Sequence, residues 1–178
     1  NAVIFVFDFT SYKSETNVTL LNDIFAGRED LKKDLDKVFF VLNKIDMRTE
    51  KDGDVPNILA NVKELIKTAT KNVIDSPNVI PVSALKALQG RMLLQNNISE
   101  KDKEGLERKY AGPYGQKVEI NGRTLIDILT GDKLGNALFE DSMLPALEKE
   151  VLINTFANAT ESLYKESLNT LNRRLDKL

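Results

Sequence analysis

The chain has 178 residues, 42% of them hydrophobic, which is enough to bury the core of one domain. Its 25 Lys and Arg residues nearly balance 27 Asp and Glu residues, so the net charge of -2 gives no general attraction to nucleic acid or anionic lipid. The lack of Cys and His excludes disulfides, thiolate chemistry and the usual zinc ligands. No apolar run approaches the roughly 20 residues that span a bilayer.

Three short runs of β-branched and aromatic residues predict strands, at residues 2–7, 37–42 and 78–82. Each run is nearly continuous rather than alternating, which is typical of parallel strands buried on both faces. Apolar residues at helical spacing predict helices between them, over about 13–25 and 56–73. The β-α-β-α-β order predicts a parallel sheet with helices on its faces.

The following segment is more polar. A helix is expected over 85–96, whereas 97–122 is rich in Gly and charge, and its Gly-Pro-Tyr-Gly sequence at 112–115 is typical of a loop. Alternation on both sides of an Asn-Gly pair makes a small hairpin possible over 117–124.

From residue 125 onward the helical spacing returns, with a predicted break at 131–135. Pro145 suits the first turn of a long amphipathic helix that runs to Leu178. Such a helix is longer than a compact domain needs, so its far end is expected to pack on another element. The alternative is a terminal helix that bends and folds back over its own sheet.

A polar motif, Asn43-Lys44-Ile45-Asp46, follows the second strand and matches the pattern N-K-x-D. Open α/β sheets bind ligands at this carboxyl end of their strands. The carboxylate of Asp46 can accept both N1–H and N2–H of guanine, a donor pair that adenine lacks. Asn43 can pair with the N7 and O6 edge of the base, and the aliphatic stem of Lys44 can lie over the base plane. In the alternative interpretation, Asn43 and Asp46 only cap the turn.

A second motif, Ser83-Ala84, follows the third strand. Small residues let backbone N–H groups approach a planar ligand, and the N–H of Ala84 is a candidate donor to guanine O6. Together the two motifs predict a guanine site made of Asn43, Lys44, Asp46, Ser83 and Ala84. The sequence indicates no catalytic or metal-binding residue.

With these motifs the chain resembles the later part of a P-loop GTPase domain, and within that superfamily dynamin-like proteins. The resemblance to bacterial dynamin-like GTPases, including the group related to the clamp-binding dynamin homologue, rests on Val6–Glu15, Val82–Leu88 and Glu140–Leu178. It implies an α/β fold with a partial P-loop GTPase-type parallel sheet and flanking helices, followed by a long C-terminal helix.

The resemblance also implies a division of the chain. Residues 1–97 would be the C-terminal half of a GTPase domain, 98–137 a partly irregular insert, and 138–178 a terminal helix that leads into a helical bundle or stalk. The first residue is not Met and the chain opens on a strand, so we expect a piece of a longer protein. Loss of earlier strands would expose a sheet edge, which favours self-association.

In function, the resemblance implies a parent that binds and hydrolyses GTP with Mg²⁺, self-associates and is cytoplasmic. It also allows membrane contact by the intact protein. The phosphate-binding G-x-x-x-x-G-K-[ST] motif of such a parent is not found in this sequence. This part alone is therefore expected to recognise the guanine of GTP or GDP, to bind the nucleotide poorly and to be inactive as an enzyme.

The alternative function is a non-enzymatic scaffold or interaction module with a degenerate α/β core, which would act through its terminal helix. Nucleic acid is not an expected partner, because acidic residues match the Lys and Arg residues of 101–109. Asp8 and the pair Lys13-Ser14 lie beyond the first strand, near where a nucleotide could reach. The preferred interpretation of that segment is a helix start capped by Thr10 or Ser11.

Overall fold

The computed structural model describes residues 3–33, 35, 38–120 and 123–153. Strands β1 (Val3–Asp8), β2 (Val38–Asn43) and β3 (Val79–Pro81) form a parallel sheet in the order β1-β2-β3. The register aligns Asp8 with Asn43 at the carboxyl ends of β1 and β2. The chain is α/β, and the predicted parallel sheet is confirmed.

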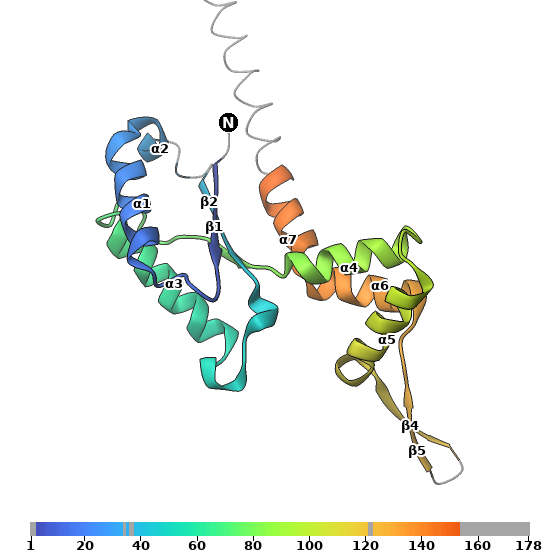
Figure 1. The fold of residues 1–178 in the computed structure, drawn as a ribbon. Coiled ribbons are helices and arrows are strands. Elements are labelled where there is room, and N and C mark those ends of the chain that lie inside the picture. The colour runs from blue at the N-terminus through green and yellow to red at the C-terminus, as the bar shows by residue number, and fades with distance from the viewer. Residues whose placement is uncertain (1–2, 34, 36–37, 121–122, 154–178) are drawn as a thin grey trace, which may run out of the picture.

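Helices α1 (Glu15–Gly27), α2 (Glu29–Lys33) and α3 (Val55–Ala69) lie on one side of this sheet (Figure 1). The cap of α1 is Ser14, whose hydroxyl accepts a hydrogen bond from the backbone N–H of Asn17 at 3.4 Å. The expectation that Thr10 or Ser11 caps this helix is therefore wrong. Thr10 instead bonds to Asp8.

Helix α3 buries the predicted apolar face. Ile58, Val62 and Ile66 are at most 3% exposed and pack in the main core with apolar residues of α1, β1 and β2. The helix ends at Ala69, earlier than predicted, because the backbone turns left-handed immediately afterwards. Lys71 has a φ of 53° and Asn72 a φ of 63°.

The two long strands differ in burial. Five of the six residues of β2 are buried, as expected for a strand covered on both faces. In β1, Phe7 is buried, but Ile4 is 46% and Val6 63% exposed. The prediction that β1 is buried on both faces is therefore wrong. Among the described residues β1 pairs only with β2, and it forms an edge of the sheet.

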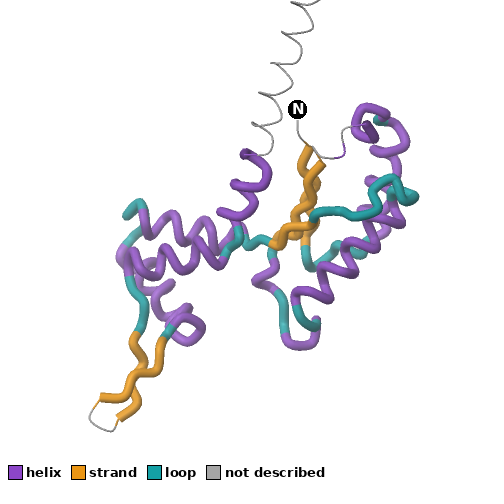
Figure 2. Tube along the Cα trace, turned by 180° about the vertical axis from the view of Figure 1, so that it is seen from behind, coloured by secondary structure: helices purple, strands orange, loops and turns teal. Residues whose placement is uncertain are grey.

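A helical module follows the sheet and consists of α4 (Ala84–Leu94), α5 (Glu100–Tyr114) and α6 (Gly131–Asp141). Strands β4 (Gln116–Ile120) and β5 (Arg123–Asp127) form the expected antiparallel hairpin, although its turn lies outside the described residues. Figure 2 shows the hairpin projecting from the helices on the side away from the sheet.

The loop predicted over 97–122 is wrong, because α5 occupies most of it and includes Pro113 in its last turn. Ser99 caps α5, accepting a hydrogen bond from the N–H of Asp102. The helix is held by one buried side chain, Tyr110, which packs in a small core with Leu93, Leu134 and Leu138. This core joins helices on both sides of the predicted boundary between residues 97 and 98.

The predicted return of helix at residue 125 and its break at 131–135 are also wrong. Residues 123–127 form β5, and α6 begins at Gly131 and continues through Gly135. Gly135 lies where α6 crosses α4, and a Cβ added at Gly90 of α4 would be 2.7 Å from the carbonyl oxygen of Gly135. The Gly residue permits a close contact between the helices rather than ending one.

After α6 the chain continues into α7 (Leu144–Glu148), with Pro145 in the first turn as expected, and then into a π-helical turn, Lys149–Ile153. Leu147 packs on Val41, Ile80 and Val82, on the sheet face opposite α1 and α3. The rest of the predicted long C-terminal helix lies outside the described residues. None of the described helices is long and apolar enough to cross a membrane.

Candidate functional site

The two predicted motifs are in direct contact. Asn43 is the last residue of β2, and Lys44, with a φ of 65°, turns the chain into a 3-10 turn, Ile45–Met47. The side-chain oxygen of Asn43 accepts hydrogen bonds from the backbone N–H of Lys44 at 2.8 Å and of Ala84 at 3.1 Å. The Asn43 side chain therefore connects the start of its own turn to the Ser83-Ala84 loop.

Backbone hydrogen bonds hold the ends of β2 and β3 together. Val82 N donates to Leu42 O at 2.9 Å, and Ile45 N donates to Val82 O at 3.2 Å. Phe9 N donates to Asn43 O at 2.9 Å, which brings the segment after β1 to the same place. The site lies where all three parallel strands end, as the sequence predicts.

Ser83 is 1% exposed and is fixed by two contacts. Its hydroxyl accepts a hydrogen bond from Lys86 N at 3.1 Å and so caps α4, and its backbone N–H donates to the carbonyl of Ser142 at 3.0 Å. The Ser83 side chain thus determines where α4 begins and where the N–H of Ala84 lies.

Asp46 differs from the other site residues because it has a buried polar atom with no partner. In the part of the chain that the structure describes, its Oδ1 is the one buried side-chain oxygen or nitrogen without a hydrogen bond. A buried polar atom without a partner is costly, and the cost is larger for a charged group. Asp46 therefore does not act as a turn cap through this oxygen, whose capacity to accept a hydrogen bond is unused.

The ammonium group of Lys44 is paired with Asp8, the last residue of β1. Lys44 Nζ lies 2.5 Å from Asp8 Oδ2, while Asp8 Oδ1 accepts hydrogen bonds from Thr10 N at 2.9 Å and Thr10 Oγ1 at 2.7 Å. The hydrogen bond from Lys44, followed by those from Thr10, lowers the pKa of Asp8 from 3.8 to about 2. The position of Asp8 beyond the first strand is predicted from the sequence, but its contact with Lys44 is not. The signal for this contact is the parallel register, which sets Asp8 beside Asn43.

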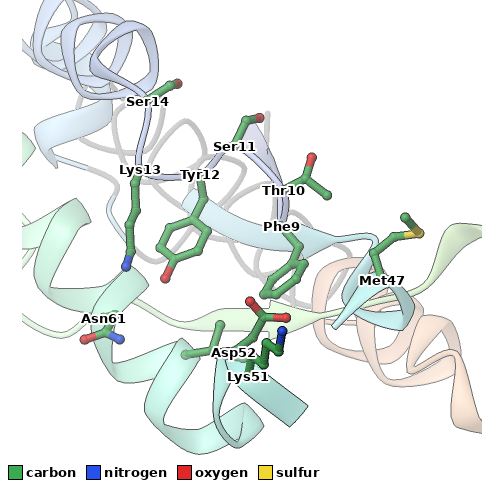
Figure 3. A pocket seen from close by; sticks show the side chains of 11 residues that line it. Phe9, Thr10, Ser11, Tyr12, Lys13, Ser14, Met47, Lys51, Asp52 and Asn61 are labelled. Carbon is green, nitrogen blue, oxygen red and sulfur yellow. The ribbon is translucent and has the colours of Figure 1, made fainter. Parts of the chain in front are cut away.

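A pocket of about 750 Å³ lies next to this site, between the loop after β1 and the start of α3. Phe9, Tyr12, Lys13 and Asn61 contribute side chains to it (Figure 3), and Met47 lies at its border with the N-K-x-D turn. None of the five predicted guanine-binding residues lines it. The predicted site and this pocket are therefore adjacent but distinct.

A polar cluster follows the site on α4. Lys86 Nζ lies 2.5 Å from Asp141 Oδ2 of α6, which also accepts a hydrogen bond from the hydroxyl of Tyr114 of α5. Burial raises the pKa of Asp141, but the hydrogen bonds from Lys86 and Tyr114 outweigh it and leave that pKa below its usual value. These polar contacts connect α5 and α6 to the first turn of α4.

Comparison of the chain with protein-family models, with curated proteins and with solved structures gives no match.

Proposed function

We propose that this chain is the base-recognising part of a guanine-nucleotide-binding domain, in a parent protein that is a dynamin-like GTPase. The observation that carries the proposal is the buried, unpartnered carboxylate oxygen of Asp46, which lies one turn from the hydrogen bond between Asn43 and Ala84. A charged acceptor at the carboxyl end of a parallel sheet suits a ligand with two adjacent N–H donors, which guanine has.

Base binding would involve an exchange of hydrogen bonds. The N–H of Ala84, the proposed donor to guanine O6, donates to Asn43 in the described structure. If O6 replaces Asn43 as its acceptor, the Asn43 amide becomes free to turn toward N7. Lys44 would cover the base plane with its aliphatic stem. Ser83 would act indirectly, because its hydroxyl is engaged at the start of α4.

The proposal assigns no phosphate or metal chemistry to these residues. The resemblance to dynamin-like GTPases implies Mg²⁺ in the parent, but the described part of the chain has no group of three or more acidic side chains that could hold a metal ion. Because the G-x-x-x-x-G-K-[ST] motif is not found in the sequence, we propose that this chain alone does not hydrolyse GTP, and that GTP hydrolysis, self-association and any membrane contact belong to the intact parent.

The test exploits a difference between guanine and xanthine. Xanthine has a carbonyl oxygen at the position where guanine has the N2 amino group. An amide offers one acceptor and one donor, so Asp46→Asn should match xanthine, whereas the wild-type carboxylate matches guanine. NMR titrations of the chain with GMP, AMP and xanthosine monophosphate measure this preference even when binding is weak.

We expect the wild-type chain to prefer GMP over AMP. Asp46→Asn should weaken GMP binding by about tenfold or more and make xanthosine monophosphate the better ligand. Asp52→Asn is a suitable control, since Asp52 lies on the same loop but bonds to Thr49. Equal affinity of the wild-type chain for GMP and AMP would refute base recognition and favour the scaffold alternative.

A further inference from the structure

Lys44 is held at both ends of its side chain. At its backbone, the left-handed conformation and the hydrogen bond from its N–H to Asn43 fix where the side chain starts. At its ammonium group, the ion pair with Asp8 fixes where the side chain ends. The two residues are 36 positions apart in the sequence and meet only because β1 and β2 are parallel neighbours.

Asp8 is itself held by a neighbour. Thr10 donates two hydrogen bonds to Oδ1, so only Oδ2 is directed at Lys44. The Asp8 side chain is 32% exposed, whereas that of Lys44 is 53% exposed. The fixed carboxylate is thus the more buried partner, and the flexible lysine the more exposed one.

We propose that Asp8, supported by Thr10, is a positioning residue that orients Lys44 for contact with the nucleotide base; this inference rests on the proposed function. A lysine side chain has a flexible stem of four carbons and a strongly hydrated ammonium group. Without Asp8 this stem would sample many rotamers, and the base would have to order it on binding. With Asp8 present, the Lys44 stem is already ordered before the base binds.

An ion pair elsewhere in the chain provides a matched comparison. Lys67 Nζ lies 2.5 Å from Asp75 Oδ1, the same separation as in the pair at the site. Asp75 is 78% exposed, and neither partner belongs to the N-K-x-D or Ser-Ala loop. Exposed pairs of this kind contribute little to stability. If Asp8 has a specific role, removal of its carboxylate should weaken nucleotide binding. Removal of the Asp75 carboxylate, from an ion pair of the same length, should leave nucleotide binding unchanged.

The experiment measures GMP and AMP binding by NMR titration in five forms of the chain: wild type, Asp8→Asn, Lys44→Met, the double variant and Asp75→Asn. The thermal midpoint of each form is recorded in parallel. We expect Asp8→Asn to weaken GMP binding by about threefold to tenfold while the chain stays folded at the temperature of the titration. Asp75→Asn should bind GMP as the wild type does.

The double variant distinguishes the positioning of Lys44 by Asp8 from an unspecific loss of structure. Because Asp8 acts through the Lys44 ammonium, Asp8→Asn should have no further effect once Lys44→Met has removed that group. Unchanged GMP binding by Asp8→Asn, or additive losses in the double variant, would overturn the role of Asp8 alone. A wild-type chain without preference for GMP over AMP would instead overturn the proposed function, and this inference with it. If Asp8→Asn does not fold, Thr10→Val provides the same test with a smaller expected loss.

Discussion

The crossing of α4 and α6 gives a sharp prediction about stability. In Gly90→Ala, the new Cβ would be 2.7 Å from Gly135 O and 2.9 Å from Phe139 N, both of which are backbone atoms. The helices must separate by roughly 0.7 Å to restore ordinary contact near 3.4 Å. A gap of this size forfeits about a quarter to a half of each dispersion contact in the small core between them. We expect a net loss of about 2 kcal/mol, after allowing for the better helix propensity of Ala.

Gly105→Ala is the matched control, since Gly105 is also inside a helix but a Cβ there would have no atom within 4 Å. This variant should be more stable than the wild type by about 0.5–1 kcal/mol. The two variants should therefore differ by roughly 5–12 °C in the thermal midpoint of a chain of this size. Circular dichroism at 222 nm during heating measures the difference. If Gly90→Ala is as stable as Gly105→Ala, the close helix crossing does not exist.

Two further predictions concern acid stability and the small core. The pKa of Asp8 is depressed, so its contribution to stability is present above pH 3.8 and is lost as the pH falls toward 2. Asp8→Asn should remove that part of the pH dependence of urea unfolding, and an unchanged acid curve would contradict the ion pair with Lys44. Leu138 is 0% exposed, so Leu138→Ala should lower the free energy of unfolding by about 2–5 kcal/mol in the same assay, whereas a loss below about 1 kcal/mol would contradict its burial.

The sheet and the meeting of the two motifs are predictable from the sequence. A central parallel strand is covered on both faces, so β2 has an unbroken apolar run that is easy to recognise. The carboxyl ends of parallel neighbours share one edge, which is why Asn43 and Ala84 meet. By contrast, the exposure of Ile4 and Val6 depends on what packs on the far face of β1. No pattern within the strand encodes that.

The helical module is less predictable, because its core is small. In α5, one side chain, Tyr110, is buried, and most other positions are charged or small, so the local composition resembles a loop. From the sequence alone, Gly135 is compatible with either a helix break or a close contact between helices. Only the position of Gly90 on the neighbouring helix decides between these two roles. Such contacts are tertiary and override local propensity.

The candidate site also depends on the helical module, and not only on the sheet. Ser142 is 0% exposed, and its carbonyl accepts the hydrogen bond from Ser83 N. Its hydroxyl donates to Phe139 O at 2.5 Å and accepts from Leu144 N at 3.1 Å, which fixes the junction between α6 and α7. Movement of this junction relative to the sheet must therefore displace Ser83 or break its hydrogen bond. Either change alters the position of the adjacent N–H of Ala84, the group that the proposed function assigns to guanine O6.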